Sequence, residues 1–232
     1  GVTGVQTCAL PIYWCVVPDP SVVPVEWRAD DRDGSLRCWA SAYPHLLRWL
    51  VRSQVPYEDR ARGYVCLNLR QQVLQQPYPY QQQAIEAWVA RRHAGVVVLP
   101  TGAGKTYLAV LAMVLLQRST LVVTPTLDLV SQWYEVLMRA FGIDVGVIGG
   151  GDNDLREVTV TTYDSAHLQA ERLGPRFGLV VYDECHHLAG ESYLLSAKAS
   201  IAPFRLGLTA TFERPRSEEH TSELQSHQRI SY

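Results

Sequence analysis

Hydrophobic residues in the second half of the chain fall in short runs separated by segments of helical spacing. Val96–Leu99 is a run of β-branched and aliphatic residues without polar alternation, which predicts a strand buried on both faces. Similar runs occur at 121–123, 145–148, 158–161, 179–182 and 205–209. Between them, 106–116 and 127–141 carry apolar residues at helical spacing. This alternation predicts an α/β fold with a parallel sheet and helices on both faces.

The first third of the chain has a different pattern, rich in Trp and Pro from Tyr13 to about Asp59. Within it, 43–51 places its apolar residues on one helical face, and 64–69 is predicted to be a short strand. Residues 71–79 are interpreted as a linker, after which an amphipathic helix opens at Tyr80. We therefore expect a small accessory element over residues 13–76 and the main domain over residues 77–215.

Both ends of the chain resemble translated sequencing adapters. Residues 216–227, RSEEHTSELQSH, and the closing 230–232 match one common short-read adapter, and residues 2–12 match the opposite adapter strand. We interpret residues 1–12 and 216–232 as foreign to the fold, as one would a tag, and expect the second segment to be disordered. A polar tail and an apolar leader would explain the composition but not the match.

A glycine-rich sequence, TGAGKT, directly follows the predicted strand that ends at Leu99. Gly102 and Gly104 allow the backbone to approach an anion, and the helix that follows directs its N-terminal amides at the same place. In this pattern a lysine, here Lys105, reaches the β- and γ-phosphates and a hydroxyl, here Thr106, reaches Mg²⁺. The expected nucleotide-binding residues are Gln81, Thr101, Gly102, Ala103, Gly104, Lys105 and Thr106.

Gln81 is assigned to this set because of its side-chain chemistry. A carboxamide can donate to and accept from the N6/N7 edge of adenine, and it would then select ATP over GTP. The alternative is a solvent-exposed glutamine at the start of a helix, and the sequence does not separate the two.

Four further polar segments each follow a predicted strand directly. They are Thr124–Thr126, Thr161–Tyr163, Asp183–His187 and Thr209–Thr211. Because parallel strands point the same way, their carboxyl ends meet along one edge, where such sheets bind ligands. We expect these segments and the glycine-rich sequence to lie together.

Asp183 and Glu184 form an acidic pair at the end of one of these strands. Asp183 would hold Mg²⁺ through water, opposite the Thr106 hydroxyl, and Glu184 would polarise the attacking water as general base. With Lys105 they are the candidate catalytic residues. The alternative is a pair of acidic residues that only solvates a loop. A zinc site at residues 185–187 is discounted, because three adjacent residues cannot all face one metal.

Composition narrows the class of protein. The formal net charge is −2 and hydrophobic residues make up 47%, so contact with nucleic acid must come from a local surface or helix ends. The 5 cysteines form no C-x-x-C pair, which favours a reducing, cytoplasmic location. No run reaches the roughly 18 apolar residues of a membrane span.

Five motifs occur in order along the chain: LPTGAGKT, VVTPTLDLVSQW, VTTYDS, VYDECHH and LGLTATFER. Together they resemble the motifs of superfamily 2 DExH-box helicases, and bacterial and archaeal relatives of the XPB repair helicase in particular. The resemblance implies a RecA-like P-loop NTPase domain in which His186 with Thr209 and Thr211 couples nucleotide state to the grip on nucleic acid. It also implies contacts with a DNA strand or fork from Thr124, Pro125, Thr126, Thr161, Thr162 and Tyr163.

The function implied by the resemblance is that of an ATP-dependent DNA helicase or translocase with Mg²⁺ as cofactor. Such enzymes use a second RecA-like domain with an arginine finger, which this sequence does not include, so we expect the chain by itself to be nearly inactive. A repair or nuclease protein is the expected partner. Two alternatives stay open: a restriction-type translocase subunit and a non-catalytic, nucleotide-gated binding module.

Overall fold

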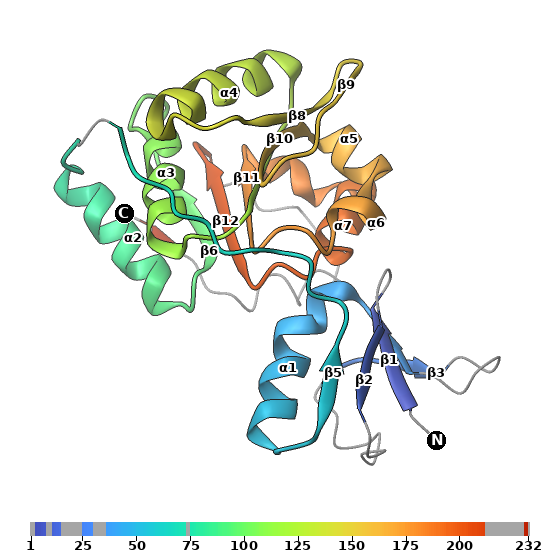
Figure 1. The fold of residues 1–232 in the computed structure, drawn as a ribbon. Coiled ribbons are helices and arrows are strands. Elements are labelled where there is room, and N and C mark those ends of the chain that lie inside the picture. The colour runs from blue at the N-terminus through green and yellow to red at the C-terminus, as the bar shows by residue number, and fades with distance from the viewer. Residues whose placement is uncertain are drawn as a thin grey trace.

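The computed structural model describes two units, a small N-terminal one and a larger α/β one (Figure 1). The described residues are 3–7, 11–14, 25–29, 36–72, 75–211 and 230–231.

The larger unit is built on a mostly parallel sheet. Its strands follow the order β13-β6-β12-β11-β7-β10-β8-β9. Their bounds are β6 Ala94–Val98, β7 Thr120–Thr124, β8 Gly146–Gly149, β9 Asp152–Asn153, β10 Val158–Thr162, β11 Leu179–Asp183, β12 Phe204–Thr209 and β13 Ile230–Ser231. Only β9, paired with β8, is antiparallel. The predicted α/β class with a parallel sheet is therefore confirmed.

Helices cover both faces of this sheet (Figure 1). One face carries α2 Pro79–Ala90, α3 Lys105–Leu116 and α4 Leu127–Phe141, and the other carries α5 Tyr163–Leu168, α6 Ala170–Leu173 and α7 Glu191–Lys198. Side chains of β11 alternate between the two cores, with Leu179 and Val181 on the first face and Val180 and Tyr182 on the second. In the part of the chain that the structure describes, no helix is long and apolar enough to cross a membrane.

The predicted boundaries agree with the structure where a regular hydrophobic pattern extends over a long segment. The helix predicted over 127–141 is α4 with the same bounds. Two predictions are wrong. Val96 is 36% exposed, because β6 lies near the edge of the sheet and only part of it is covered. Residues 64–69 form no strand but a single bridge between Cys66 and Arg118.

The small unit combines a five-stranded sheet with helix α1 (Tyr43–Arg52). Its strands are β1 Thr3–Thr7, β2 Pro11–Trp14, β3 Arg28–Ala29, β4 Leu36–Cys38 and β5 Tyr57–Asp59. Tyr43, Leu46 and Leu50 fill its core together with Ile201, which comes from the larger unit. The helix predicted over 43–51 is therefore confirmed, and its apolar face holds the small unit together.

The adapter-like ends also appear in the structure. Strand β1 pairs with β2 and β4, and β13 pairs with β6. The interpretation of both ends as foreign sequence stays a prediction. The expected tail over 216–232 lies outside the described residues apart from β13.

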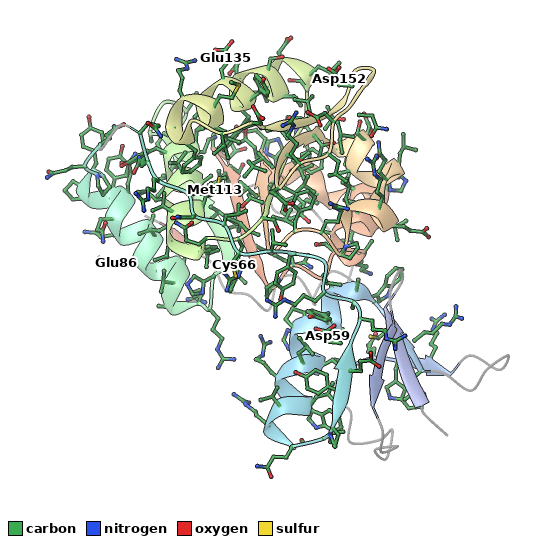
Figure 2. The ribbon with its side chains drawn as sticks, in the orientation of Figure 1. Asp59, Cys66, Glu86, Met113, Glu135 and Asp152 are labelled. Carbon is green, nitrogen blue, oxygen red and sulfur yellow. The ribbon has the colours of Figure 1, made fainter. Side chains whose placement is uncertain are left out.

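A connecting segment, residues 60–72, joins the two units and runs along the larger one; Figure 2 labels Cys66 on it. Backbone hydrogen bonds attach it at Gly63 to Pro175 (3.0 Å) and at Leu67 to Gln117 (2.9 Å). The Gln117 carboxamide also bonds both the N–H and the C=O of Leu69, at 2.6 and 3.0 Å. The Gln117 side chain thus adds two hydrogen bonds between the connecting segment and the end of α3.

Replacing Gln117 with alanine is expected to lower the free energy of unfolding by about 1–3 kcal/mol, because the part-buried Leu69 amide and carbonyl lose their partners. Urea unfolding followed by circular dichroism measures this change. Gln82→Ala removes an exposed side chain that donates to Glu86 on the same helix; it is the control and should change stability little. Equal effects of the two substitutions would contradict the role given to Gln117.

Candidate functional site

The glycine-rich segment, residues 101–106, is a turn between β6 and α3. Gly102 and Gly104 have φ of 81° and 78°, a left-handed conformation that other residues adopt at a cost. A Cβ at Gly104 would also collide with the Gln81 carboxamide. The turn therefore requires glycine, and it directs the start of α3 toward the carboxyl end of the sheet.

The lysine of this segment meets the acidic pair of β11. Lys105 Nζ lies 2.8 Å from Glu184 Oε1, and both side chains are mostly shielded from solvent. Strand β12 separates β6 from β11 in the sheet, so this contact reaches across one strand at its carboxyl end. The structure thus brings together two of the segments that sequence patterns placed on this edge.

The two carboxylates have different surroundings. Burial works against ionisation of Glu184, but the hydrogen bond and charge of Lys105 outweigh it, and the pKa of Glu184 is lowered. Burial raises the pKa of Asp183, although a hydrogen bond from Trp133 opposes the change. Glu184 also has φ of 47°, a left-handed conformation that is strained for a residue other than glycine and is typical of functional sites.

A second set of contacts continues from Glu184 to the end of β12. His186 Nδ1 lies 3.6 Å from Glu184 Oε2 and 3.1 Å from Thr209 Oγ1. Thr209 Oγ1 donates to the carbonyl of Thr211 at 3.0 Å. His186, Thr209 and Thr211, which are expected to couple nucleotide state to DNA, are therefore linked by a chain of contacts to Glu184 of the acidic pair.

Gln81 lies beside the glycine-rich segment but is buried, not solvent-exposed. Its Nε2 donates to the carbonyl of Ala103 (3.0 Å) and its Oε1 accepts from the backbone N–H of Tyr78 (3.0 Å). The carboxamide thus holds the turn in place, and one N–H of its Nε2 has no partner among these bonds.

A pocket of about 440 Å³ opens next to Gln81. Its lining includes Tyr78, Tyr80, Gln81, Gly102, Ala103, Gly104, Thr106, Tyr107 and Arg139. The rings of Tyr78 and Tyr80 are stacked, with centroids 5.7 Å apart. The two tyrosines were missed by sequence reasoning, although the YPY sequence just before Gln81 was a usable signal.

The six residues assigned to nucleic acid are only partly accessible. Thr124, Thr161, Thr162 and Tyr163 are buried, and Thr161 and Tyr163 direct their hydroxyls inward, to Ile148 and Asp183 carbonyls. Their side chains therefore support the strand ends, and contact of these four residues with nucleic acid stays a prediction. Only Pro125, half-buried, and Thr126, exposed at the start of α4, stay open to a ligand.

Cys185, which follows the acidic pair, is expected to be inert. Burial, and then the charge of Glu184, raise the pKa of its thiol to about 12, so about one thiol in ten thousand is ionised at pH 8. Alkylation with iodoacetamide at pH 8, read by peptide mass spectrometry, should label exposed Cys66 and leave Cys185 unlabelled. Denatured protein, labelled at both, is the control. Equal labelling in the native chain would contradict this environment.

Fold and site together define an α/β domain of the RecA-like class, with a glycine-rich turn, a lysine and an acidic pair at one edge of a parallel sheet. Residues 74–214 match the family described as "Type III restriction enzyme, res subunit". This is more than half of the chain, and the chain belongs to that family.

Relatives and solved structures agree with this assignment. The chain is 47% identical over 135 residues to "DNA 3'-5' translocase XPB2" of Sulfurisphaera tokodaii, covering 58% of this chain and 30% of that protein. It is 32% identical over 152 residues to "DNA 3'-5' helicase XPB" of Kineococcus radiotolerans, covering 61% and 27%.

The fold is similar to the crystal structure of the UvsW helicase from bacteriophage T4, with a TM-score of 0.51 and 20% identity over 83% of this chain and 64% of that one. The chain spans less than a third of the length of the two curated relatives. The resemblance to XPB-like superfamily 2 helicases is therefore confirmed for the part of those proteins that this chain covers.

Proposed function

We propose that the larger unit is the ATP-binding first motor domain of a DNA helicase or translocase that couples ATP hydrolysis to movement on DNA. The contact between Lys105 and Glu184, at 2.8 Å, is the observation that carries the proposal. It joins the element that would bind phosphate to the element that would activate water. Residues 77–215 would form this domain, and residues 13–76 an accessory element.

The nucleotide would bind at the glycine-rich segment. Amides of residues 102–106 and the N-terminus of α3 suit an anion, and Lys105 supplies a charge on a side chain already held at this edge. The neighbouring pocket, with its stacked tyrosines, would take the base. Gln81 would select adenine, because its remaining N–H would donate to N7 and the second lone pair of Oε1 would accept from the N6 amino group that guanine lacks, while it keeps the bonds that order the turn.

The residues present fit Mg²⁺ that arrives with a nucleotide. Among the described residues no group of three His, Cys, Asp or Glu side chains is placed to hold a metal by itself, and Mg²⁺ characteristically takes one or two protein ligands and completes its shell with phosphates and water. Thr106 and Asp183 would hold it. When bound, it would neutralise charge that develops on the phosphates.

Glu184 is the proposed general base. The lowered pKa keeps this carboxylate ionised near neutral pH, as accepting a proton from water requires. Lys105 would leave Glu184 for the phosphates when nucleotide binds, which frees the carboxylate for water. His186, in contact with both Glu184 and Thr209, would pass this change to the end of β12.

DNA would contact the edge of the sheet at Pro125 and Thr126, where α4 begins. Contacts there would reach the phosphate backbone without reading sequence. A DNA strand or fork is the proposed substrate because the curated relatives carry the names of DNA translocases and helicases. A restriction-type translocase subunit is the second candidate, favoured by the description of the matching family.

Equilibrium dialysis of the chain against labelled ATP and GTP, with Mg²⁺ present, tests the proposal. We expect saturable binding of ATP and weaker binding of GTP. Fluorescence anisotropy of a labelled single-stranded or forked DNA then measures the affinity of the chain for DNA. We expect this affinity to change when ATP is added. A chain that binds neither nucleotide would contradict the proposal, and binding of ATP without any effect on DNA would favour a nucleotide-binding module that does not move on DNA.

A further inference from the structure

Trp133, on α4, is the last residue of the VVTPTLDLVSQW motif and makes a hydrogen bond to the acidic pair. Its Nε1 donates to Asp183 Oδ2 at 2.8 Å. Both residues are buried, with exposures of 2% and 7%. An indole has one N–H donor and no acceptor, so the Trp133 side chain can only donate to the carboxylate. A hydrogen bond to a charged carboxylate is stronger than one between two neutral groups.

Two further bonds fix the same residue. Asp183 Oδ1 accepts from the backbone N–H of Glu184 at 3.1 Å, and the Asp183 carbonyl accepts from the Tyr163 hydroxyl at 3.0 Å. The carboxylate plane is therefore set by one donor at each oxygen. Glu184 N belongs to the neighbouring backbone, whereas Trp133 lies on a different helix. Among the described residues, only the Trp133 side chain joins the carboxylate to another element by a hydrogen bond.

We propose that Trp133 is a positioning residue that orients the Asp183 carboxylate toward the magnesium bound with the nucleotide. The inference rests on the proposed function, in which Asp183 holds that ion. Because Thr126, the proposed DNA contact, caps the N-terminus of α4, the bond also links the helix next to the proposed DNA contact to the carboxylate. A shift of α4 would then change how well the carboxylate faces the metal.

Trp88 provides a matched control. It is also fully buried, and its Nε1 also makes one hydrogen bond, to the carbonyl of Arg205 at 3.0 Å. That bond does not involve the acidic pair. Trp88→Phe and Trp133→Phe therefore both remove a buried indole N–H and leave a similar packing defect, but only Trp133→Phe removes a donor from Asp183.

The test measures how binding of labelled ATP depends on MgCl₂ concentration. Trp133→Phe is expected to raise the half-saturating Mg²⁺ concentration about 10-fold, the low end of the range for groups that orient metal ligands. Binding of ATP in EDTA should stay unchanged. Trp88→Phe should leave the Mg²⁺ midpoint where it is in the wild type, whatever it does to the melting temperature.

A second substitution covers the case in which Trp133→Phe does not fold. Benzothienylalanine at position 133 has nearly the shape of tryptophan with sulfur in place of N–H, and should give the same Mg²⁺ shift. In an Asp183→Asn background, Trp133→Phe should add no further shift.

The outcomes separate the two claims. A wild-type chain without Mg²⁺-dependent ATP binding overturns the proposed function and the inference with it. A wild type that binds, with Trp133 and Trp88 variants of equal Mg²⁺ midpoint, overturns only the inference. The inference is also overturned if Trp133→Phe shifts the Mg²⁺ midpoint as much in the Asp183→Asn background as it does in the wild type.

Discussion

Lys105→Ala is expected to weaken ATP binding by at least about 30-fold, because truncating one partner of a buried charged contact costs about 2–5 kcal/mol. Lys105 lies in the glycine-rich segment, where the phosphates are expected, and its side chain is largely shielded from solvent. Loss of Lys105 also leaves Glu184 without its cationic partner. The unpaired Glu184 carboxylate would then repel the negatively charged phosphates of the nucleotide. Equilibrium dialysis with labelled ATP and MgCl₂ measures the change.

The other lysine of the chain, Lys198, gives the control. It lies at the end of α7 and contacts the Trp39 ring, with Nζ 5.3 Å from the centroid, away from the glycine-rich segment. Lys198→Ala should leave ATP affinity within about twofold of the wild type, the range of substitutions outside a binding site. Equal weakening by the two alanine substitutions would mean that Lys105 has no particular role in binding.

Glu184→Gln is expected to separate binding from hydrolysis. The amide keeps the shape of the side chain but cannot take a proton, so the slow hydrolysis expected of this chain should fall by a further factor of about 10²–10⁴, the usual contribution of a general base. ATP binding should be equal or tighter, because Lys105 no longer has to leave a carboxylate at 2.8 Å. Single-turnover hydrolysis of labelled ATP and equilibrium dialysis give the two values.

Glu135→Gln is the matched control for this substitution. Glu135 is exposed on α4 and pairs with Arg139 at 2.8 Å; Figure 2 labels it at the surface. Its change should affect neither value, since exposed ion pairs contribute little. Loss of binding and hydrolysis to the same degree in Glu184→Gln would contradict the division of roles between Lys105 and Glu184.

The class of fold could be predicted from sequence because the sheet is parallel and covered on both faces. That burial produces unbroken apolar runs such as 179–182, and both cores of the structure use alternate residues of β11. Of the small unit, the helix over 43–51 could be predicted but the sheet could not, because β3 and β5 have only 2 and 3 residues. Such strands carry no readable period, and their pairing depends on segments distant in sequence.

The site was predictable as far as it follows strand ends. Lys105, Glu184, His186 and Thr209 meet because parallel strands end at one edge. Side-chain direction was not predictable. Tyr163 follows a strand as the others do, yet it points into the core and bonds the Asp183 carbonyl. The bond from Trp133 joins residues 50 positions apart, and no local pattern encodes such a contact.

A structure of the chain with a non-hydrolysable ATP analogue and Mg²⁺ tests the central claim most directly. We expect the phosphates on the amides of residues 102–106, Lys105 Nζ moved from Glu184 to the phosphates, and the metal between Thr106 and Asp183. An analogue bound elsewhere, with the contact between Lys105 and Glu184 unchanged, would contradict it.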